Sequence, residues 1–216
     1  MTGVVVALGD SITRGRGGEP ALGVHPQSWA QWLAETLGAP FLNLAQDGAV
    51  AADVLRSQVP RLAGPYELGL LYVGVNDVRG LRWDAAAFER EVDAIVVALR
   101  AACARVVVVT LPEDVGRPSA APKPAQANLA LRALEGVELV DLSDFGGALH
   151  VLPDVVHPTS AGMVEIARRA ARVVGAPDPG PDDPIPAAGP RYRAWWARLW
   201  LRDVARRGLE RRTLRR

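Results

Sequence analysis

Five short runs of apolar residues, rich in Val, Leu and Ala, recur along the first 142 residues of the chain. Runs of this length and composition are typical of strands that are buried on both faces of a sheet. We expect strands at residues 4–8, 68–73 and 106–110, a weaker strand at 137–142 and a shorter one at 41–44.

Helical patterns separate these runs. Ser28, with Gln31 three residues later, makes a capping box, and Asp84 and Thr159 are typical helix caps. Apolar residues then recur at helical spacing, most clearly after Asp84. We expect helices over residues 28–37, 84–101 and 159–174, the first and the last of them ended by a glycine.

Strands that alternate with helices predict a mostly parallel sheet whose connections are right-handed crossovers. The expected fold class is therefore α/β, with a five-stranded sheet between two layers of helices. In such a sheet, ligands bind at the carboxyl ends of the strands. Residues directly after each strand are thus the first candidates for chemistry.

The end of the chain differs from the rest. Six prolines between residues 177 and 190 predict an extended, stiff linker. Residues 191–216 hold ten Arg and two acidic residues, whereas the rest of the chain has 15 basic and 22 acidic residues. We therefore expect a domain of residues 1–175, a linker of residues 176–190 and a basic tail of residues 191–216.

The composition, with 49% apolar and 23% charged residues in a chain of 216, fits one globular domain with an appendage. A single cysteine, Cys103, allows no internal disulfide, and the sequence has no Walker A loop and no zinc-binding motif. We expect neither a cofactor nor a metal. No apolar run approaches the roughly 20 residues of a membrane span and no export signal is visible, which predicts a cytoplasmic protein.

Ser11 follows the first expected strand, in the sequence Gly9-Asp10-Ser11. A simple strand-to-helix turn with a helix cap would use the same residues. Alternatively, Ser11 is a nucleophile whose own N–H, at the start of a helix, helps to stabilise an oxyanion. A serine needs a base to act in this way, and the chain offers three histidines.

His157 is the histidine with the most informative surroundings. Asp154 lies three residues before it, and a carboxylate at that spacing on a tight turn can hold one ring nitrogen while the other points outward. His25 and His150 have no carboxylate at this upstream spacing. We expect these two to be exposed or merely packed side chains.

Two further strand ends offer hydrogen-bond donors for an oxyanion. Asn76 follows the strand at residues 68–73, and Gly48 follows the short strand at residues 41–44. Each residue also suits an ordinary turn. A side-chain amide and a glycine N–H at neighbouring strand ends are nevertheless donors of the kind that a tetrahedral intermediate requires.

These groups occur in the order of the four sequence blocks of the GDSL or SGNH hydrolases, here Gly9-Asp10-Ser11, Gly48 after Asn43, Gly74-Val75-Asn76-Asp77, and Asp154-Val155-Val156-His157. The chain resembles this family over nearly all of residues 1–175, and its actinobacterial branch in particular. The resemblance implies a flavodoxin-like three-layer α/β/α fold and a serine esterase. By position, it implies a catalytic triad of Ser11, His157 and Asp154, and an oxyanion hole formed by the N–H groups of Ser11 and Gly48 and the side chain of Asn76.

Two residues depart from the pattern of that family. Val155 stands where many members have glycine, so the turn there must accommodate a β-branched residue. Asp47 precedes Gly48 and would disfavour an oxyanion if its carboxylate turned inward. We expect Asp47 to point to solvent.

The resemblance is compatible with short-chain carboxyl esters, lysophospholipids and acetylated sugars as substrates. We expect small acyl groups, because the loops that would line the pocket, at residues 14–24, 78–83 and 115–123, contain Gly and Pro and suit a shallow site. The expected partner is a small-molecule ester. The alternative from another class is a module that binds such a ligand without hydrolysing it.

The basic tail has an amphipathic pattern. Its aromatic residues and Leu199 share one helical face with arginines beside it, an arrangement that suits an anionic membrane surface. The same face can instead pack on the acidic domain, and we favour this interpretation because exposed Trp clusters are unfavourable. We expect no specific nucleic-acid binding, since no recognition motif accompanies the arginines.

Overall fold

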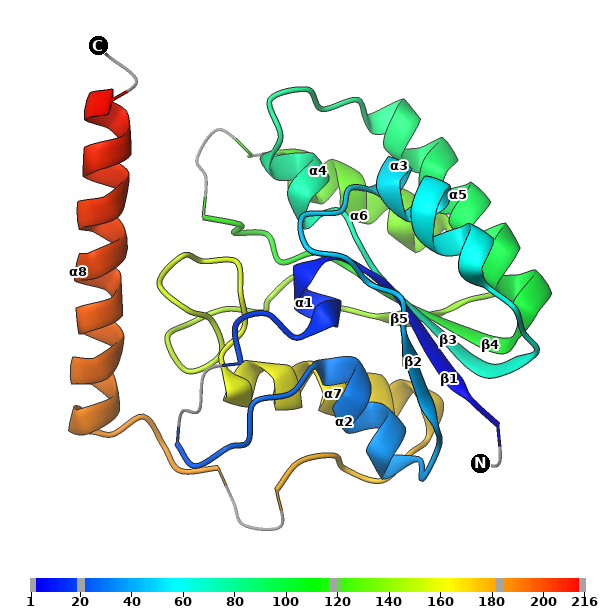
Figure 1. Cartoon of the computed structure of the whole chain (residues 1–216), viewed down its shortest axis with the longest axis horizontal. Helices are drawn as coiled ribbons and strands as arrows, with labels where there is room; N and C mark the ends of the chain where they lie inside the picture. The colour runs from blue at the N-terminus through cyan, green and yellow to red at the C-terminus, as the bar shows by residue number, and fades with distance from the viewer. Residues whose placement is uncertain (1–2, 19–21, 117–119, 121, 182–184, 214–216) are drawn as a thin grey trace.

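Five parallel strands form the centre of the molecule (Figure 1). The computed structural model describes residues 3–18, 22–116, 120, 122–181 and 185–213. The strands pair in the order β2-β1-β3-β4-β5, and every pairing is parallel. Their bounds are β1 (Val5–Gly9), β2 (Phe41–Asn43), β3 (Tyr66–Tyr72), β4 (Cys103–Val109) and β5 (Glu138–Val140). The five predicted strands are therefore confirmed, with ends that shift by at most three residues.

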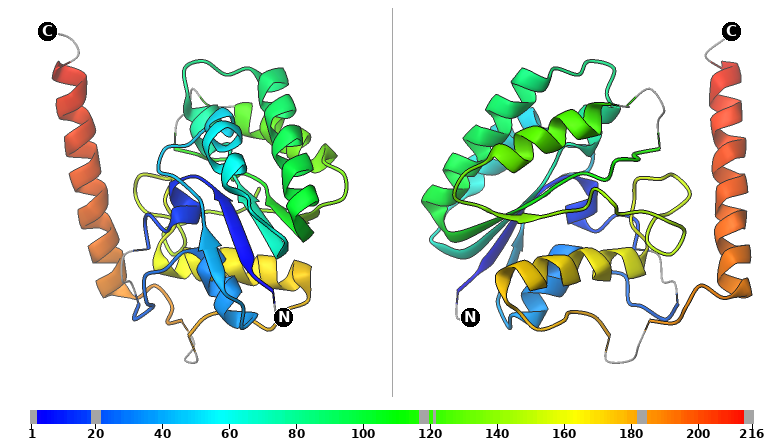
Figure 2. Two further views of the ribbon diagram at one scale, coloured as in Figure 1. Left: turned by 45° about the vertical axis from the view of Figure 1, so that its right-hand side comes forward. Right: turned by 180° about the vertical axis from the view of Figure 1, so that it is seen from behind.

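Helices cover both faces of this sheet, as Figures 1 and 2 show. One face is covered by α2 (Trp29–Thr36) and α7 (Ser160–Val174). The other is covered by α3 (Ala51–Asp53), η1 (Val54–Gln58), η2 (Val59–Arg61), α5 (Ala85–Ala102) and α6 (Lys123–Ala133). The short helices α1 (Ser11–Arg14) and α4 (Val75–Arg79) directly follow β1 and β3. This arrangement confirms the three-layer α/β/α sandwich.

The sheet is the core of the sandwich. All five residues of β1 are buried, and β3 and β4 are buried over most of their length. Burial of each Val or Leu side chain contributes about 1.5–3 kcal/mol, so a sheet buried on both faces is a rigid platform for the loops at its edge.

The three predicted helix caps form. Ser28 accepts a hydrogen bond from the N–H of Gln31, Asp84 from that of Ala87, and Thr159 from that of Gly162. The second hydrogen bond of the expected capping box, from the Ser28 N–H to the Gln31 side chain, was predicted wrongly. The Gln31 side chain donates to Glu35 instead.

Three helical segments were not expected from the sequence, and the shortest of them is α4. Residues 51–61 form α3, η1 and η2, where a proline interrupts the helical pattern. Helix α6 buries Pro124, Ala127, Asn128 and Leu131, of which only one is a large apolar residue. Its helical periodicity is therefore weak, although the position of the helix over the sheet is clear.

The proline-rich segment after α7 stays close to the domain. Arg168 on α7 donates a hydrogen bond to the carbonyl oxygen of Pro179 and forms an ion pair with Asp178 at 3.1 Å. The part of the predicted linker at residues 182–184 lies outside the described residues. The tail then forms α8 (Pro190–Thr213), the expected basic helix. No helix within the described ranges has the length and apolarity needed to cross a bilayer.

Candidate active site

The carboxyl ends of the strands bring the candidate residues to one edge of the sheet (Figure 1). Ser11 begins α1 directly after β1, Gly48 lies in the loop after β2, and Asn76 lies on α4 after β3. The loop that precedes α7 carries Asp154 and His157. The candidate residues therefore come from four separate parts of the sequence and lie on the edge where an α/β sheet is expected to bind its ligand.

Ser11, His157 and Asp154 form one hydrogen-bonded chain. The Ser11 Oγ lies 3.1 Å from Nε2 of His157, and Nδ1 of the same ring lies 2.6 Å from Oδ2 of Asp154. With a proton on Nδ1, held by the carboxylate, Nε2 is free to accept the serine proton. This is the geometry that a hydroxyl nucleophile needs for activation.

A tight turn holds Asp154 in place. Its Oδ1 accepts hydrogen bonds from the backbone N–H groups of Val156 and His157, both at 3.0 Å. Burial raises the pKa of Asp154, but the hydrogen bonds and charge of His157, together with the backbone N–H groups, outweigh burial and bring the pKa below its ordinary value. The carboxylate is therefore ionised when the imidazole needs a counter-charge.

Val155 adopts the backbone conformation that glycine favours. Its φ is +57°, in the left-handed region that is unfavourable for a β-branched side chain. The turn therefore keeps the shape that glycine would give it, in spite of the departure noted in the sequence. The two backbone hydrogen bonds to Asp154 hold the turn in this unfavourable backbone conformation of Val155.

The three candidate oxyanion donors come from the segments that follow β1, β2 and β3. Among the hydrogen bonds of the described residues, none uses the backbone N–H of Ser11 or that of Gly48. Gly48 has a φ of +76°, and open space surrounds the position where a Cβ would stand, so the loop conformation itself calls for glycine. The Asn76 amide donates one hydrogen to the Ala49 carbonyl oxygen at 3.1 Å, and its second hydrogen makes only a long contact, of 3.5 Å, with Oδ2 of Asp10.

Asp10, next to the candidate nucleophile, is almost completely buried. Its Oδ1 accepts from the N–H of Ile12 and so caps α1, and its Oδ2 lies 3.5 Å from the amide nitrogen of Asn76. Burial raises the pKa of Asp10 to about 7, and the Ile12 N–H and the His157 charge lower it only in part. Asp10 therefore links the start of the Ser11 helix to Asn76.

Asp47 points to two arginines of the neighbouring loop. Its Oδ2 accepts from Arg16 at 2.8 Å, and Arg14 lies 3.8 Å from its Oδ1. The hydrogen bond from Arg16 and the charge of both arginines hold the pKa of Asp47 below its ordinary value. Asp47 is exposed, as expected, and its charge is also neutralised by the two arginines, which connect the Gly48 loop to the Ser11 loop.

Sequence reasoning missed Gln58, a fully buried residue of η1. Its side chain accepts from the Gly9 N–H at 2.9 Å and donates to the Gly9 carbonyl oxygen at 2.8 Å. Gly9 stands two residues before Ser11, so Gln58 fixes the backbone that presents this serine. The only sequence signal is one polar residue in an otherwise mixed helical stretch, which does not identify a partner.

Gly17 was also missed. Its φ is +101°, and a Cβ built there would lie 2.4 Å from the carbonyl oxygen of Pro158 and 2.9 Å from the Cβ of His157. Only glycine allows this close approach. The loop after α1 therefore packs directly against His157.

The other histidines lie away from the hydrogen-bonded chain. His25 is exposed, and the His150 ring stacks on Phe145 with centroids 5.6 Å apart. Burial lowers the pKa of His150. Both positions agree with the expectation of exposed or packed side chains.

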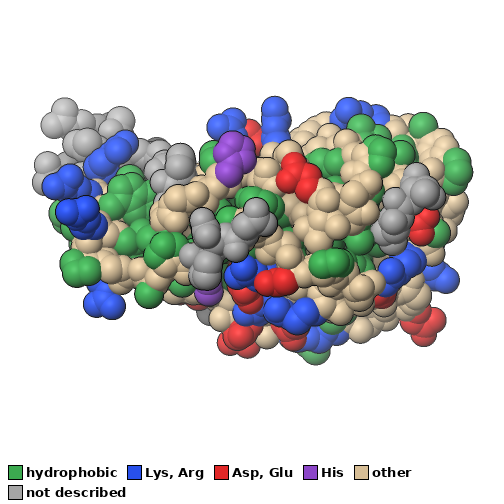
Figure 3. Space-filling view, turned by 90° about the horizontal axis from the view of Figure 1, so that it is seen from below, with side chains coloured by type: hydrophobic (Ala, Val, Ile, Leu, Met, Phe, Trp, Pro, Cys, Tyr) green, Lys and Arg blue, Asp and Glu red, His purple; other side chains and the backbone are tan. Residues whose placement is uncertain are grey.

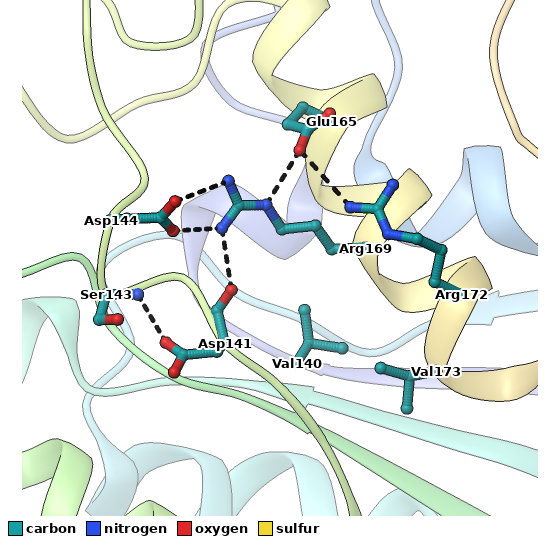
Figure 4. Close-up of a pocket in the computed structure, with 8 residues that line it drawn as sticks. All are labelled: Val140, Asp141, Ser143, Asp144, Glu165, Arg169, Arg172 and Val173. Carbon is teal, nitrogen blue, oxygen red and sulfur yellow. Dashed lines mark hydrogen bonds and ion pairs between the residues drawn. The ribbon is translucent and has the colours of Figure 1, made fainter.

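A charged cluster anchors the chain between β5 and the loop that carries His157 (Figure 4). Arg169 of α7 pairs with Asp144 and with Glu165, and donates to the Asp141 carbonyl oxygen. A cavity of about 560 Å³ adjoins this cluster and shares no residue with the Ser11, His157 and Asp154 chain. Asp141 and Asp144 thus form ion pairs with arginines. The carboxylate that His157 contacts is that of Asp154.

A second cavity, of about 510 Å³, opens beside Asn76. Val50, Leu81, Trp83 and Phe88 give it apolar walls, and Asp77 and Glu91 add carboxylates. Burial raises the pKa of Asp77 to about 6. The predicted loop at residues 78–83 therefore lines a cavity next to one of the candidate oxyanion donors, whereas residues 19–21, 117–119 and 121 of the other two loops lie outside the described residues.

No group of three His, Cys, Asp or Glu side chains that could hold a metal ion occurs in the part of the chain that the structure describes.

Comparisons with known proteins agree with the fold and with the family that the sequence resembles. The model of the GDSL-like Lipase/Acylhydrolase family matches residues 7–164. Comparison with curated protein sequences finds no match.

Three solved structures illustrate the likeness in fold. An alpha/beta hydrolase enzyme, LAE5, from the metagenome of Lake Arreo is 19% identical, with a TM-score of 0.66 over 80% of this chain and 95% of its own. The acetylxylan esterase Axe2 from Geobacillus stearothermophilus is 16% identical, with a TM-score of 0.62 over 80% and 94%. TesA is 22% identical, with a TM-score of 0.62 over 79% and 97%.

Proposed function

The chain belongs to the GDSL-like lipase/acylhydrolase family and is a carboxylic ester hydrolase of the SGNH type. On that premise we propose that it hydrolyses esters of small or short-chain acyl groups through an acyl-enzyme formed on Ser11. The observation that carries the proposal is the unbroken series of contacts from the Ser11 hydroxyl through the His157 ring to the Asp154 carboxylate.

Acylation begins at the serine. Nε2 of His157 takes the proton from Ser11 as Oγ attacks the ester carbonyl carbon. Asp154 keeps the other ring nitrogen protonated and stabilises the imidazolium that forms. The imidazolium then gives its proton to the leaving alcohol, and a water activated by the same histidine later hydrolyses the acyl-enzyme.

The negative charge that develops on the carbonyl oxygen needs fixed donors. In our proposal the N–H groups of Ser11 and Gly48 and the amide of Asn76 supply them. The Ala49 carbonyl oxygen orients this amide before the substrate arrives, and the hydrogen that makes the long contact with Asp10 turns to the oxyanion. The Arg16 partner of Asp47 offsets the carboxylate charge that lies next to Gly48.

The cavity beside Asn76 supports small acyl groups as substrates. Its volume of about 510 Å³ lies within the usual range for small-molecule sites, and its apolar walls suit a short alkyl chain. Trp83 forms one of these walls and is held there, because its ring nitrogen donates to Gln126 at 2.7 Å and its ring packs against Phe88. We infer that long acyl chains extend into solvent and gain little.

A series of p-nitrophenyl esters from acetate to palmitate tests this function. We expect the highest kcat/KM for the shortest chains, and we expect Ser11→Ala and His157→Gln to lose at least about 1,000-fold in kcat. His25→Ala is the matched control and should retain wild-type activity. A preference for palmitate would contradict the acyl-chain part of the proposal.

A module that only binds ligands is the competing class. Covalent labelling with a fluorophosphonate distinguishes the two, because the reagent reacts with an activated serine and not with a turn residue. We expect labelling of the wild type and none of Ser11→Ala. An unlabelled wild type that is folded would exclude the proposed nucleophile.

A further inference from the structure

Helix α8 contacts the domain only near its start, among the residues that the structure describes. Tyr192 is buried, and its hydroxyl donates to the Ala148 carbonyl oxygen at 2.7 Å. The ring nitrogen of Trp196 donates to the carbonyl oxygen of Val151 at 3.0 Å. Figures 1 and 2 show the rest of the helix standing apart from the sandwich in every view.

Beyond this contact the helix exposes large apolar side chains. Trp200 is 44% exposed, Leu201 59% and Val204 42%. These three residues are close in sequence and lie on the turns just past Trp196. Such a cluster on a helix is unfavourable in water and indicates a surface that meets a partner.

The charge of the same segment is of one sign. Arg191, Arg193, Arg198 and Arg202 are exposed, and residues 191–202 contain no acidic residue. None of the ion pairs of the described residues involves these four arginines. In Figure 3 the end of the molecule that carries α8 shows arginines around apolar side chains, whereas the domain shows acidic and basic side chains side by side.

We propose that α8 binds the surface of an anionic lipid bilayer. Apolar and Trp side chains enter the headgroup region while arginines contact the anionic headgroups, which is how interfacial helices bind. A second copy of the chain suits this face less well, since two sets of like-charged arginines would repel one another. The domain itself leaves this part of the helix uncovered, although its acidic residues were expected to attract it.

The contact at the start of α8 connects the bound surface to the proposed triad. Val151 forms a bridge with Pro158, and the N–H of Leu152 donates to the His157 carbonyl oxygen at 2.9 Å. Helix α8 therefore packs on the hairpin of residues 148–158, which carries His157. This hairpin lies on the side of the sheet where the carboxyl ends of the strands are (Figure 1). Binding would hold the ester site near the bilayer, but the binding itself does not depend on the ester that is hydrolysed.

Sedimentation of the full chain with vesicles tests the proposal. We expect binding to vesicles of phosphatidylcholine and phosphatidylglycerol at about 3:1, no binding to pure phosphatidylcholine, and release in high salt. The double variant Arg198→Gln/Arg202→Gln should lower the partition coefficient about 30-fold, from the usual contribution of two basic residues near a charged surface. Trp200→Ala should lower it about tenfold and keep the salt dependence.

The matched control is Arg61→Gln/Arg90→Gln, which removes two exposed charges of the domain and should bind like the wild type. Hydrolysis of a soluble ester by the α8 variants should equal that of the wild type, which shows that they fold. Equal binding to both kinds of vesicle, or equal loss in the control, would overturn the proposal. So would a dimer in sedimentation velocity that the α8 substitutions dissociate, because a second copy would then be the partner.

Discussion

Asp10 and Asn76 are the two residues beside Ser11 whose environment says most about their roles. Asp10 is almost fully buried and carries a strongly raised pKa, whereas Asn76 is partly exposed and is held by the Ala49 carbonyl oxygen. The amide of one lies 3.5 Å from the carboxyl oxygen of the other. A structural carboxyl group thus supports a side chain that we propose to act on the substrate.

Asn76→Ala should lower kcat by about 100- to 1,000-fold and change KM little, because an oxyanion donor acts on the transition state more than on the bound ester. Steady-state kinetics with p-nitrophenyl acetate measure both constants. Asn43→Ala is the matched control, since that amide donates to the Thr13 carbonyl oxygen instead. Equal losses in kcat for the two variants would show that Asn76 is only structural.

Asp10 predicts a pH dependence of stability. Burial raises its pKa to about 7 in the folded protein from 3.8, so the folded state binds this proton more tightly than the unfolded chain does. Its contribution is present below about pH 4 and is lost as the pH rises toward 7. Relative to Asp10→Asn, the free energy of unfolding of the wild type should fall by at most about 4 kcal/mol over this range, at about 1.4 kcal/mol for each pKa unit.

Urea unfolding at a series of pH values measures this difference. Asp47→Asn provides the control of opposite sign, because Arg16 lowers the pKa of Asp47. Relative to that variant, the wild type should lose stability as the pH falls through the lowered pKa of Asp47. A difference between wild type and Asp10→Asn that stays constant with pH would contradict the raised pKa.

At the scale of elements, two buried amides fasten helices to strand ends. Gln58 of η1 bonds both backbone groups of Gly9, and Asn128 of α6 bonds both backbone groups of Leu111. Each amide satisfies a donor and an acceptor where the strand ladder has ended, and buried backbone groups need such partners. The two contacts are chemically alike, but only the first is next to Ser11.

Gln58→Ala should lower the free energy of unfolding by about 1–3 kcal/mol, since it leaves the buried Gly9 N–H without a partner, whereas the Gly9 carbonyl oxygen keeps its bond from the Gln46 N–H. It should also lower kcat, because Gly9 is free to move and Ser11 with it. Asn128→Ala is the control, with a loss of stability at least as large and little change in kcat. Urea unfolding and ester hydrolysis at a common temperature compare the variants, and an unchanged kcat in Gln58→Ala would refute a positioning role.

The whole molecule consists of a sandwich and a helix that meet at a small contact. Tyr192 and Trp196 provide the hydrogen bonds of that contact, on the hairpin that carries His157. Arg168 holds the intervening segment to α7. The division into domain, linker and tail stays a prediction, although the contacts indicate how a shortened chain should behave.

A chain that ends at residue 189 loses the buried Tyr192 and two hydrogen bonds, which should lower the free energy of unfolding by about 2 kcal/mol. In a protein of this size, such a loss lowers the Tm by about 4–8 °C. It should keep its activity on soluble esters. A chain that ends at residue 202 retains both contacts and should keep the wild-type Tm. Thermal unfolding followed by circular dichroism compares the three, and equal Tm values would mean that the contact adds nothing to stability.

The sequence by itself determined the strands, the helices α2, α5, α7 and α8, and the order of the candidate site residues. Strand runs and helix caps depend on neighbouring residues, so they can be read locally, as at Ser28, Asp84 and Thr159. The family resemblance added the expectation that Ser11 and His157 meet, although they lie 146 residues apart. Their assignment as nucleophile and base stays a prediction.

Only the tertiary structure decided which distant groups satisfy one another. Gln58 bonds with Gly9, which lies 49 residues away in the sequence, and Asp47 bonds with Arg16, which lies 31 residues away. No local pattern encodes such pairs, because a buried polar group is stabilised by whichever partner the packing brings within hydrogen-bond distance. The same holds for α8, whose amphipathic sequence is compatible with both packing and exposure. In the structure Tyr192 is buried against the domain, whereas Trp200 is exposed because it lies beyond the contact with the hairpin.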